Sequence, residues 1–168
     1  MVTVVHRVLL GVYARLPRRA RRHAVRIIAP SFTVGALGVV TREDGRVALI
    51  SHRYRARWGL PGGLLSRGEV PAEAVVREIR EEIGLAVEIV GEPVVVVEPV
   101  VRRVDIVFEA RLVDGASPET LAPTSPEIVD AGWFDPGEPP ELQEETIAAF
   151  AALARRAQPM GQGDETPR

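Results

Sequence analysis

Three glutamates stand close together near the middle of the chain, at spacings that place them on one side of a helix. Glu78, Glu81 and Glu82 fall within an arc of roughly 100° if the segment from Pro71 to Gly84 is helical. Like charges this close repel one another, and a bound cation removes that penalty. Carboxylate oxygens at this density suit Mg²⁺ or Mn²⁺, which complete their shells with water and substrate phosphate.

A glycine-rich segment, residues 59–63, precedes this helix. Paired glycines let the backbone adopt positive φ and approach a ligand closely, so a main-chain carbonyl can join a metal shell. A metal on a diphosphate neutralises charge, positions the phosphorus and lowers the pKa of a bound water. The combination of carboxylates and glycines therefore indicates phosphoanhydride hydrolysis.

Residues 63–85 resemble the Nudix box, the pattern Gly-x5-Glu-x7-Arg-Glu-U-x-Glu-Glu-x-Gly-U, in which U is a bulky aliphatic residue. All fixed positions match: Gly63, Glu69, Arg77, Glu78, Ile79, Glu81, Glu82, Gly84 and Leu85. The preceding Trp58-Gly59-Leu60-Pro61-Gly62 is similar to the usual lead-in of the family. The likeness extends from about Ser31 to Arg156. A glutamate-rich helix face is ordinarily just solvated, but a match at nine positions favours function.

The resemblance implies an α/β fold, the Nudix α/β/α sandwich, with a mixed sheet and the box as a loop-helix-loop. It makes Glu78, Glu81 and Glu82 the metal ligands, together with the carbonyl of Gly62.

The resemblance also assigns Arg77 and Glu69 to orienting the metal ligands through hydrogen bonds. The general base differs among subfamilies. It is either a box glutamate, of which Glu78 is the best candidate, or a carboxylate on a later loop, here Glu127. Both alternatives stay open.

The implied activity is Mg²⁺-dependent hydrolysis, with Mn²⁺ as a substitute, of a nucleoside diphosphate linked to a further group. The coenzyme A signature of the family is absent, and no tyrosine follows the box as in dinucleoside polyphosphate hydrolases. Nucleoside triphosphates, ordinary or oxidised, ADP-ribose-like sugars and other such compounds stay open. The alternative function is a catalytically idle nucleotide sensor.

Basic residues just before the glycine segment are candidates for binding substrate phosphates, because the arginine fork suits phosphate. They are His52, Arg53, Arg55 and Arg57, and Trp58 is a candidate for stacking on a base. A solvated basic loop and a tryptophan packed under it are the structural alternatives. Arg102 and Arg103 precede a later strand that borders the expected cleft.

The elements that must position these residues alternate irregularly along the chain. Strands are predicted at residues 31–40, 47–51, 87–101 with an interruption at 91–93, 104–112 and 128–134. Asp44-Gly45 predicts a hairpin between the first two. Helices are predicted after Pro71, with Gly84 as a left-handed cap, and from Glu141 to about Arg156. This order indicates a mixed sheet with helices on its faces.

The 168-residue chain has no cysteine, which excludes disulfides and thiolate metal sites, and no apolar run of the roughly 20 residues needed to span a bilayer. We expect a cytoplasmic protein with a Nudix domain at 31–157, a disordered tail at 158–168 and a basic helical leader at 1–30.

The leader contains arginines but no acidic residue. Packing on the domain or on a homodimer partner is favoured over peripheral membrane contact. No specific nucleic-acid partner is expected, because no nucleic-acid motif accompanies the arginines.

Overall fold

The computed structural model describes residue 17 and residues 31–158. The leader and the tail, apart from Pro17 and Gln158, lie outside the described residues, so the predictions made for them stay predictions. The described part contains the strands β1 (Thr33–Thr41), β2 (Val47–His52), β3 (Trp58–Gly59), β4 (Gly62–Leu64), β5 (Val87–Glu98), β6 (Arg103–Leu112) and β7 (Ile128–Phe134), with the helices α3 (Pro71–Ile83), η1 (Pro118–Thr120) and α4 (Glu144–Ala157).

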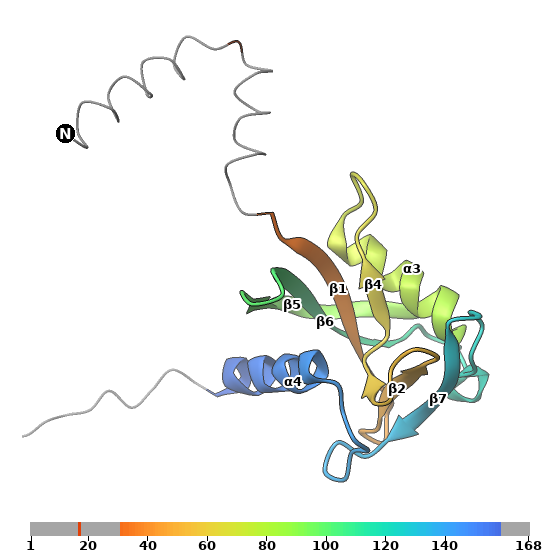
Figure 1. The fold of residues 1–168 in the computed structure, drawn as a ribbon. Helices are drawn as coiled ribbons and strands as arrows, with labels where there is room; N and C mark the ends of the chain where they lie inside the picture. Colours follow the sequence, from red (N-terminus) through yellow and green to blue (C-terminus); the bar gives the residue numbers. More distant parts are fainter. Residues whose placement is uncertain (1–16, 18–30, 159–168) are drawn as a thin grey trace, which may run out of the picture. The chain divides into compact units, whose positions relative to one another are not determined.

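The strands form one mixed sheet, in the order β3-β2-β1-β6-β5 (Figure 1). β1 is central: it runs parallel to β6 along one edge, while β4 and then β2 pair antiparallel with its other edge. β7 pairs antiparallel with β2. The predicted Asp44-Gly45 turn joins β1 to β2, and Gly45 has a φ of 85° there. The mixed sheet expected from the sequence is confirmed.

Helix α3 covers one face of this sheet. Ala36 and Val40 of β1 pack with Val75, Ile79 and Ile83 of the helix in one buried cluster. The helix lies close to the strand at Gly38, where a Cβ would be 2.6 Å from Ile79 Cδ1. Gly84 ends the helix in the left-handed conformation, as the sequence predicts. The box glutamates are therefore carried by a helix fixed along one side.

Helix α4 covers the opposite face. The alternate β1 residues Leu37 and Val39 pack with Ala149 and Leu153 of this helix in a second buried cluster. The side-chain alternation of a strand thus fills two cores at once. Figure 1 shows the helices on either side of the sheet, which is the α/β/α sandwich expected from the resemblance.

Two predicted boundaries are wrong. β5 ends at Glu98, not at residue 101, while the interruption predicted at residues 91–93 is present as a bulge between Val90 and Val94, where Gly91 adopts a φ of 68°. The last helix begins at Glu144, not at Glu141. Residues 141–143 are instead extended along Trp58, whose N–H donates to Glu141 O at 2.9 Å and whose carbonyl accepts from Gln143 N at 2.8 Å. This contact between distant segments outweighs local helix propensity.

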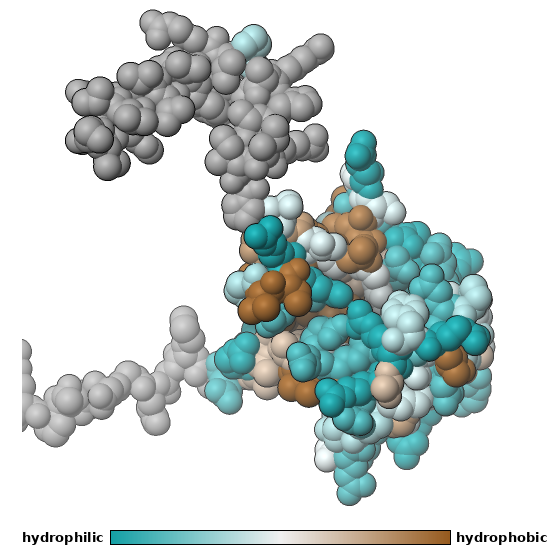
Figure 2. Space-filling model, in the orientation of Figure 1, coloured by the Kyte–Doolittle hydropathy of each residue, from teal (hydrophilic) through white to brown (hydrophobic). Residues whose placement is uncertain are grey.

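The surface view in Figure 2 is mostly hydrophilic, with separate hydrophobic patches. Exposed valines include Val90, Val95 and Val97 of β5, a strand at the edge of the sheet. A bulge and charged neighbours are common protections of such edges. Among the described helices, none has the length and apolar composition required to cross a membrane.

Candidate active site

A cavity of about 500 Å³ opens beside the sheet, between α3 and the start of α4. Its volume lies in the range of small-molecule sites. Four groups of residues line it: the glycine segment with Gly62 and Gly63, the helix residues Glu78, Glu81 and Glu82, His52 at the end of β2 with the loop residues Tyr54, Arg55, Ser125 and Glu127, and the far wall with Arg103, Gln143, Glu145 and Thr146. The structure therefore brings the three box glutamates and Glu127 to one cavity.

Arg77 ties the box together. Its Nε and Nη2 donate to the two oxygens of Glu69 at 2.8 and 3.1 Å, a two-point contact that fixes the guanidinium. Its Nη1 lies 2.9 Å from Glu78 Oε1 and 3.0 Å from Glu81 Oε2. The predicted orienting role of Arg77 and Glu69 agrees with this arrangement, in which one arginine spaces two carboxylates.

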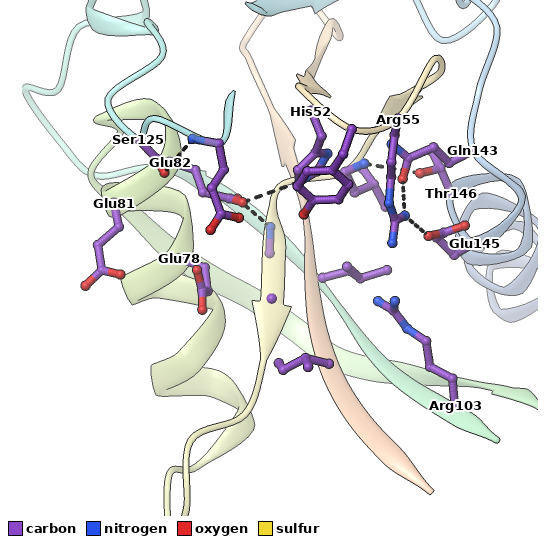
Figure 3. Close-up of a pocket in the computed structure, with 17 residues that line it drawn as sticks. His52, Arg55, Glu78, Glu81, Glu82, Arg103, Ser125, Gln143, Glu145 and Thr146 are labelled. Atoms are coloured by element: carbon purple, nitrogen blue, oxygen red, sulfur yellow. Dashed lines mark hydrogen bonds and ion pairs between the residues drawn. The ribbon is translucent and has the colours of Figure 1, made fainter. Parts of the chain in front are cut away.

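Glu82 is the most buried of the three glutamates, with a relative exposure of 9%. Its Oε2 accepts a hydrogen bond from Gly62 N at 2.8 Å, and its Oε1 lies 3.8 Å from His52 Nε2, as Figure 3 shows. The φ of 141° at Gly62 lets its N–H point at the carboxylate. His52 Nδ1 is buried and has no hydrogen-bond partner among the described residues.

Glu78 depends on the absence of a side chain at Gly63, where a Cβ would lie 2.6 Å from Glu78 Oε1. Burial raises the pKa of Glu78 against the opposing effect of Arg77, and the charges of Glu82 and Glu81 raise it further. The two neighbouring carboxylates therefore disfavour ionisation of Glu78, an effect that a cation at this wall would reverse.

This wall fits a divalent cation by the chemistry of its donors: three carboxylates and a glycine backbone. In the described part of the chain, no three acidic or histidine side chains are already gathered around one point. Glu81 and Glu78 pair with Arg77, whereas Glu82 accepts the hydrogen bond from Gly62 N, so the three carboxylates do not converge on one point. Small side-chain rotations would be required for joint coordination.

The far wall is built by the start of α4. Arg55 Nη1 donates to Gln143 Oε1 at 2.8 Å and also pairs with Glu145. Gln143 Nε2 donates to the carbonyl of Arg57 at 2.9 Å, and Thr146 Oγ1 accepts from Leu60 N at 3.1 Å. The helix thereby holds the loop between β2 and β4 in place, as Figure 3 illustrates for Arg55.

Three of the four predicted substrate-binding residues do not line the cavity. Arg53 Nε donates to the carbonyl of Pro126 at 3.4 Å, and Arg57 Nε donates to Glu141 at 2.8 Å. Trp58 packs edge-on against Phe134, with ring centroids 4.6 Å apart. The two arginines make loop contacts and the tryptophan packs against the core, which are the structural alternatives considered for these residues. Arg55 alone of the four lines the cavity.

Glu127 reaches the cavity on a loop that is fastened to the end of α3. Thr124 N donates to Glu82 O at 2.9 Å, and the Thr124 hydroxyl donates to Glu81 O at 2.8 Å. These hydrogen bonds fix the loop that carries Glu127 to the helix that carries the box glutamates.

Sequence reasoning missed the cavity residues Tyr54, Ser125, Gln143, Glu145 and Thr146. Their local spacing gives no signal, because they lie on segments that are far apart in the chain and meet only in the folded protein. The arginine pair at the start of β6, Arg102 and Arg103, is the sequence signal that identifies Arg103.

The Glu69–Arg77 pair predicts a pH dependence of stability. Hydrogen bonds from Arg77 and from Ser66 N lower the pKa of Glu69 to about 2. A carboxylate whose folded pKa is depressed adds stability above its unfolded pKa of about 4.3, and this is lost as pH falls toward 2. Urea unfolding should therefore show Glu69→Gln costing more stability at pH 7 than at pH 3. An equal cost at both pH values would contradict the ion pair.

Residues 31–155 match the family model of the NUDIX domain. A MutT-like protein of Streptomyces ambofaciens is 37% identical over 120 residues, which cover 71% of this chain and 74% of that protein. A putative 8-oxo-dGTP diphosphatase of Bacillus subtilis is 42% identical over 53 residues, 32% of this chain and 36% of that protein.

Among solved structures, a MutT NUDIX hydrolase from Burkholderia pseudomallei is 28% identical, with a TM-score of 0.61 over 74% of this chain and 99% of that chain. The match of the family model extends over most of the chain and includes every element that lines the cavity. The chain therefore belongs to the Nudix family of hydrolases.

Proposed function

We propose that this Nudix hydrolase cleaves the diphosphate linkage of a nucleoside diphosphate joined to a further group, in a Mg²⁺-dependent reaction in which Mn²⁺ can replace Mg²⁺. The observation that carries the proposal is the placement of Glu78, Glu81 and Glu82 together on one wall of a nucleotide-sized cavity. The intact set of box carboxylates favours an enzyme over an idle sensor.

Glu78, Glu81 and Glu82, with the carbonyl of Gly62, would hold the cation. When bound, Mg²⁺ would neutralise diphosphate charge and acidify a coordinated water. Arg77 would be a positioning residue, since it pairs with both Glu78 and Glu81 and so sets where their carboxylates start.

We keep two carboxylates as candidates for the general base that takes the proton of the attacking water. Glu127 approaches from the loop before β7, and Glu78 from α3. The reaction breaks one phosphorus–oxygen bond of the anhydride and yields two phosphorylated products.

A substrate panel tests the proposal. Wild-type protein is mixed with nucleoside triphosphates (ordinary and oxidised), ADP-ribose and nucleoside diphosphate sugars in ¹⁸O-labelled water, and products are identified by mass. We expect two phosphorylated products, one of them labelled, with loss of turnover in EDTA and recovery in Mg²⁺ or Mn²⁺. Tight nucleotide binding without turnover of any member would overturn the proposal and favour the sensor.

Adding a single methyl group at Gly63 is expected to lower turnover about 100-fold, the cost of misplacing a catalytic group by about 1 Å. In Gly63→Ala the new Cβ would meet Glu78 Oε1 at 2.6 Å, so the carboxylate must move. The matched control is Gly68→Ala outside the cavity; its φ of 83° strains alanine, but no atom lies within 4 Å of the Cβ. Steady-state kinetics should show a large loss of turnover in Gly63→Ala only. Thermal unfolding should show that both variants stay folded.

The location and partners expected from the sequence stay proposals. We place the enzyme in the cytoplasm with a nucleotide-type substrate as its partner. Removing residues 1–28 tests the membrane role considered for the leader. Binding to anionic liposomes that is unchanged by the deletion would eliminate that role.

A further inference from the structure

Arg103 stands on the cavity wall away from the box and is held there by a buried acid. It begins β6, and its Nε lies 2.8 Å from both oxygens of Asp105. Asp105 has a relative exposure of 2%, so this anchor is almost fully enclosed. A guanidinium fixed in this way loses little rotamer freedom when it binds a ligand.

The space for this pair is provided by Gly35 of β1. A Cβ there would lie 2.4 Å from Asp105 Oδ1, 3.3 Å from Arg103 Nη2 and 3.5 Å from the carbonyl oxygen of Gly63. The end of Arg103 and the glycine segment of the box therefore border the same small gap. This places the guanidinium beside the residues that approach the diphosphate.

The terminal nitrogens of Arg103 donate no hydrogen bond to another described residue, although its charge acts on Glu145 of the same cavity. Only its Nε takes part in a hydrogen bond or ion pair with another described residue. Arg55, the other arginine that lines the cavity, is already paired with Gln143 and Glu145. Within residues 31–158, Arg103 thus keeps two N–H-bearing nitrogens without a hydrogen-bond acceptor, a geometry suited to the oxygens of a phosphate.

The two charged walls lie on opposite sides of the central strands. Figure 3 shows Glu78, Glu81 and Glu82 on α3, to one side of β4 and β1, and Arg103 on the other side. Arg103 also borders a second hollow of about 430 Å³, so it stands where the two hollows meet. A substrate whose diphosphate is held at the glutamate wall would extend its next group toward this arginine.

We propose that Arg103 binds an anionic group next to the diphosphate, so that the enzyme prefers substrates with a terminal phosphate, such as nucleoside triphosphates, over substrates ending in a neutral sugar. This rests on the proposed function, because it requires the diphosphate at the box. Asp105 acts as a positioning residue through its hydrogen bonds to Arg103.

Binding of two non-hydrolysable nucleotides by calorimetry in Mg²⁺ tests the proposal. The probes are α,β-methylene-ADP and the ATP analogue with methylene bridges at both the α,β and the β,γ positions, which differ by the terminal phosphate group. Wild-type protein is expected to bind the triphosphate about 10- to 100-fold more tightly, as for one charge-assisted contact. Arg103→Met should remove this preference and change affinity for the diphosphate much less. Arg103→Lys keeps a positive charge beside Asp105 but should lose most of the preference for the triphosphate.

The control is Arg111→Met, an exposed arginine on the same strand that pairs with Glu88 outside the cavity. It should bind both probes as wild type does. If Arg103→Met weakens binding of both probes equally, the arginine holds the diphosphate itself, and the proposal is overturned. No weakening of either, or a wild type without preference, would also overturn it. Because no turnover is measured, a failed preference in an active enzyme refutes only Arg103, whereas an inactive enzyme refutes the proposed function.

Discussion

Replacing Glu81 and Glu82 together by glutamine is expected to lower kcat by about 1,000-fold. Both line the cavity on α3, and the change removes two of the three charges proposed to hold the cation. Metal-ion catalysis contributes several kcal/mol of charge stabilisation, and about 4 kcal/mol corresponds to this factor. Steady-state kinetics with excess Mg²⁺ and calorimetric titration with Mn²⁺ should show loss of both turnover and metal affinity.

The control for that double variant is Glu73→Gln, in the first turn of the same helix and outside the cavity. It should retain wild-type kinetics. Thermal unfolding should show that the double variant stays folded, because glutamine keeps the size of each side chain and can still accept the hydrogen bond from Gly62. Turnover that survives the double change in Mg²⁺ would refute the metal assignment.

Ile79→Ala is expected to lower the free energy of unfolding by about 2–5 kcal/mol, the usual cost of emptying a fully buried aliphatic site. Ile79 is completely buried where α3 crosses β1 at Gly38, so neighbouring backbone cannot readily fill the space. Urea unfolding measures the difference. Ile147→Ala removes the same atoms from an exposed position on α4 and should cost far less. Similar losses in both variants would contradict the packing described.

The glutamate wall could be predicted because it lies on one continuous segment. Helical periodicity alone places Glu78, Glu81 and Glu82 together, and Gly84 marks the end of the helix. The resemblance added Arg77 and Glu69, and the structure confirms that they pair. These relations are local, so each depends on neighbours within about 20 residues.

The opposite wall could not be predicted, because it is assembled from distant segments. Gln143 reaches Arg55 and Arg57 across more than 80 residues of sequence. The strands β3 and β4 contain two and three residues, too few to show an alternating pattern. For Trp58 the sequence offered base stacking and packing under the loop, and the structure shows packing against the second core cluster, next to its pairing with residues 141–143.

That pairing along Trp58 also fixes when the enzyme can become active during its synthesis. A growing chain that has reached residue 140 already contains every box residue, yet it lacks Gln143, Glu145 and Thr146, which fasten the loop between β2 and β4. The emerging protein therefore contains the proposed metal-binding helix α3 before it contains the residues that complete the cavity. Nascent chains stalled short of residue 143 should be inactive, and competence should arise as α4 leaves the ribosome.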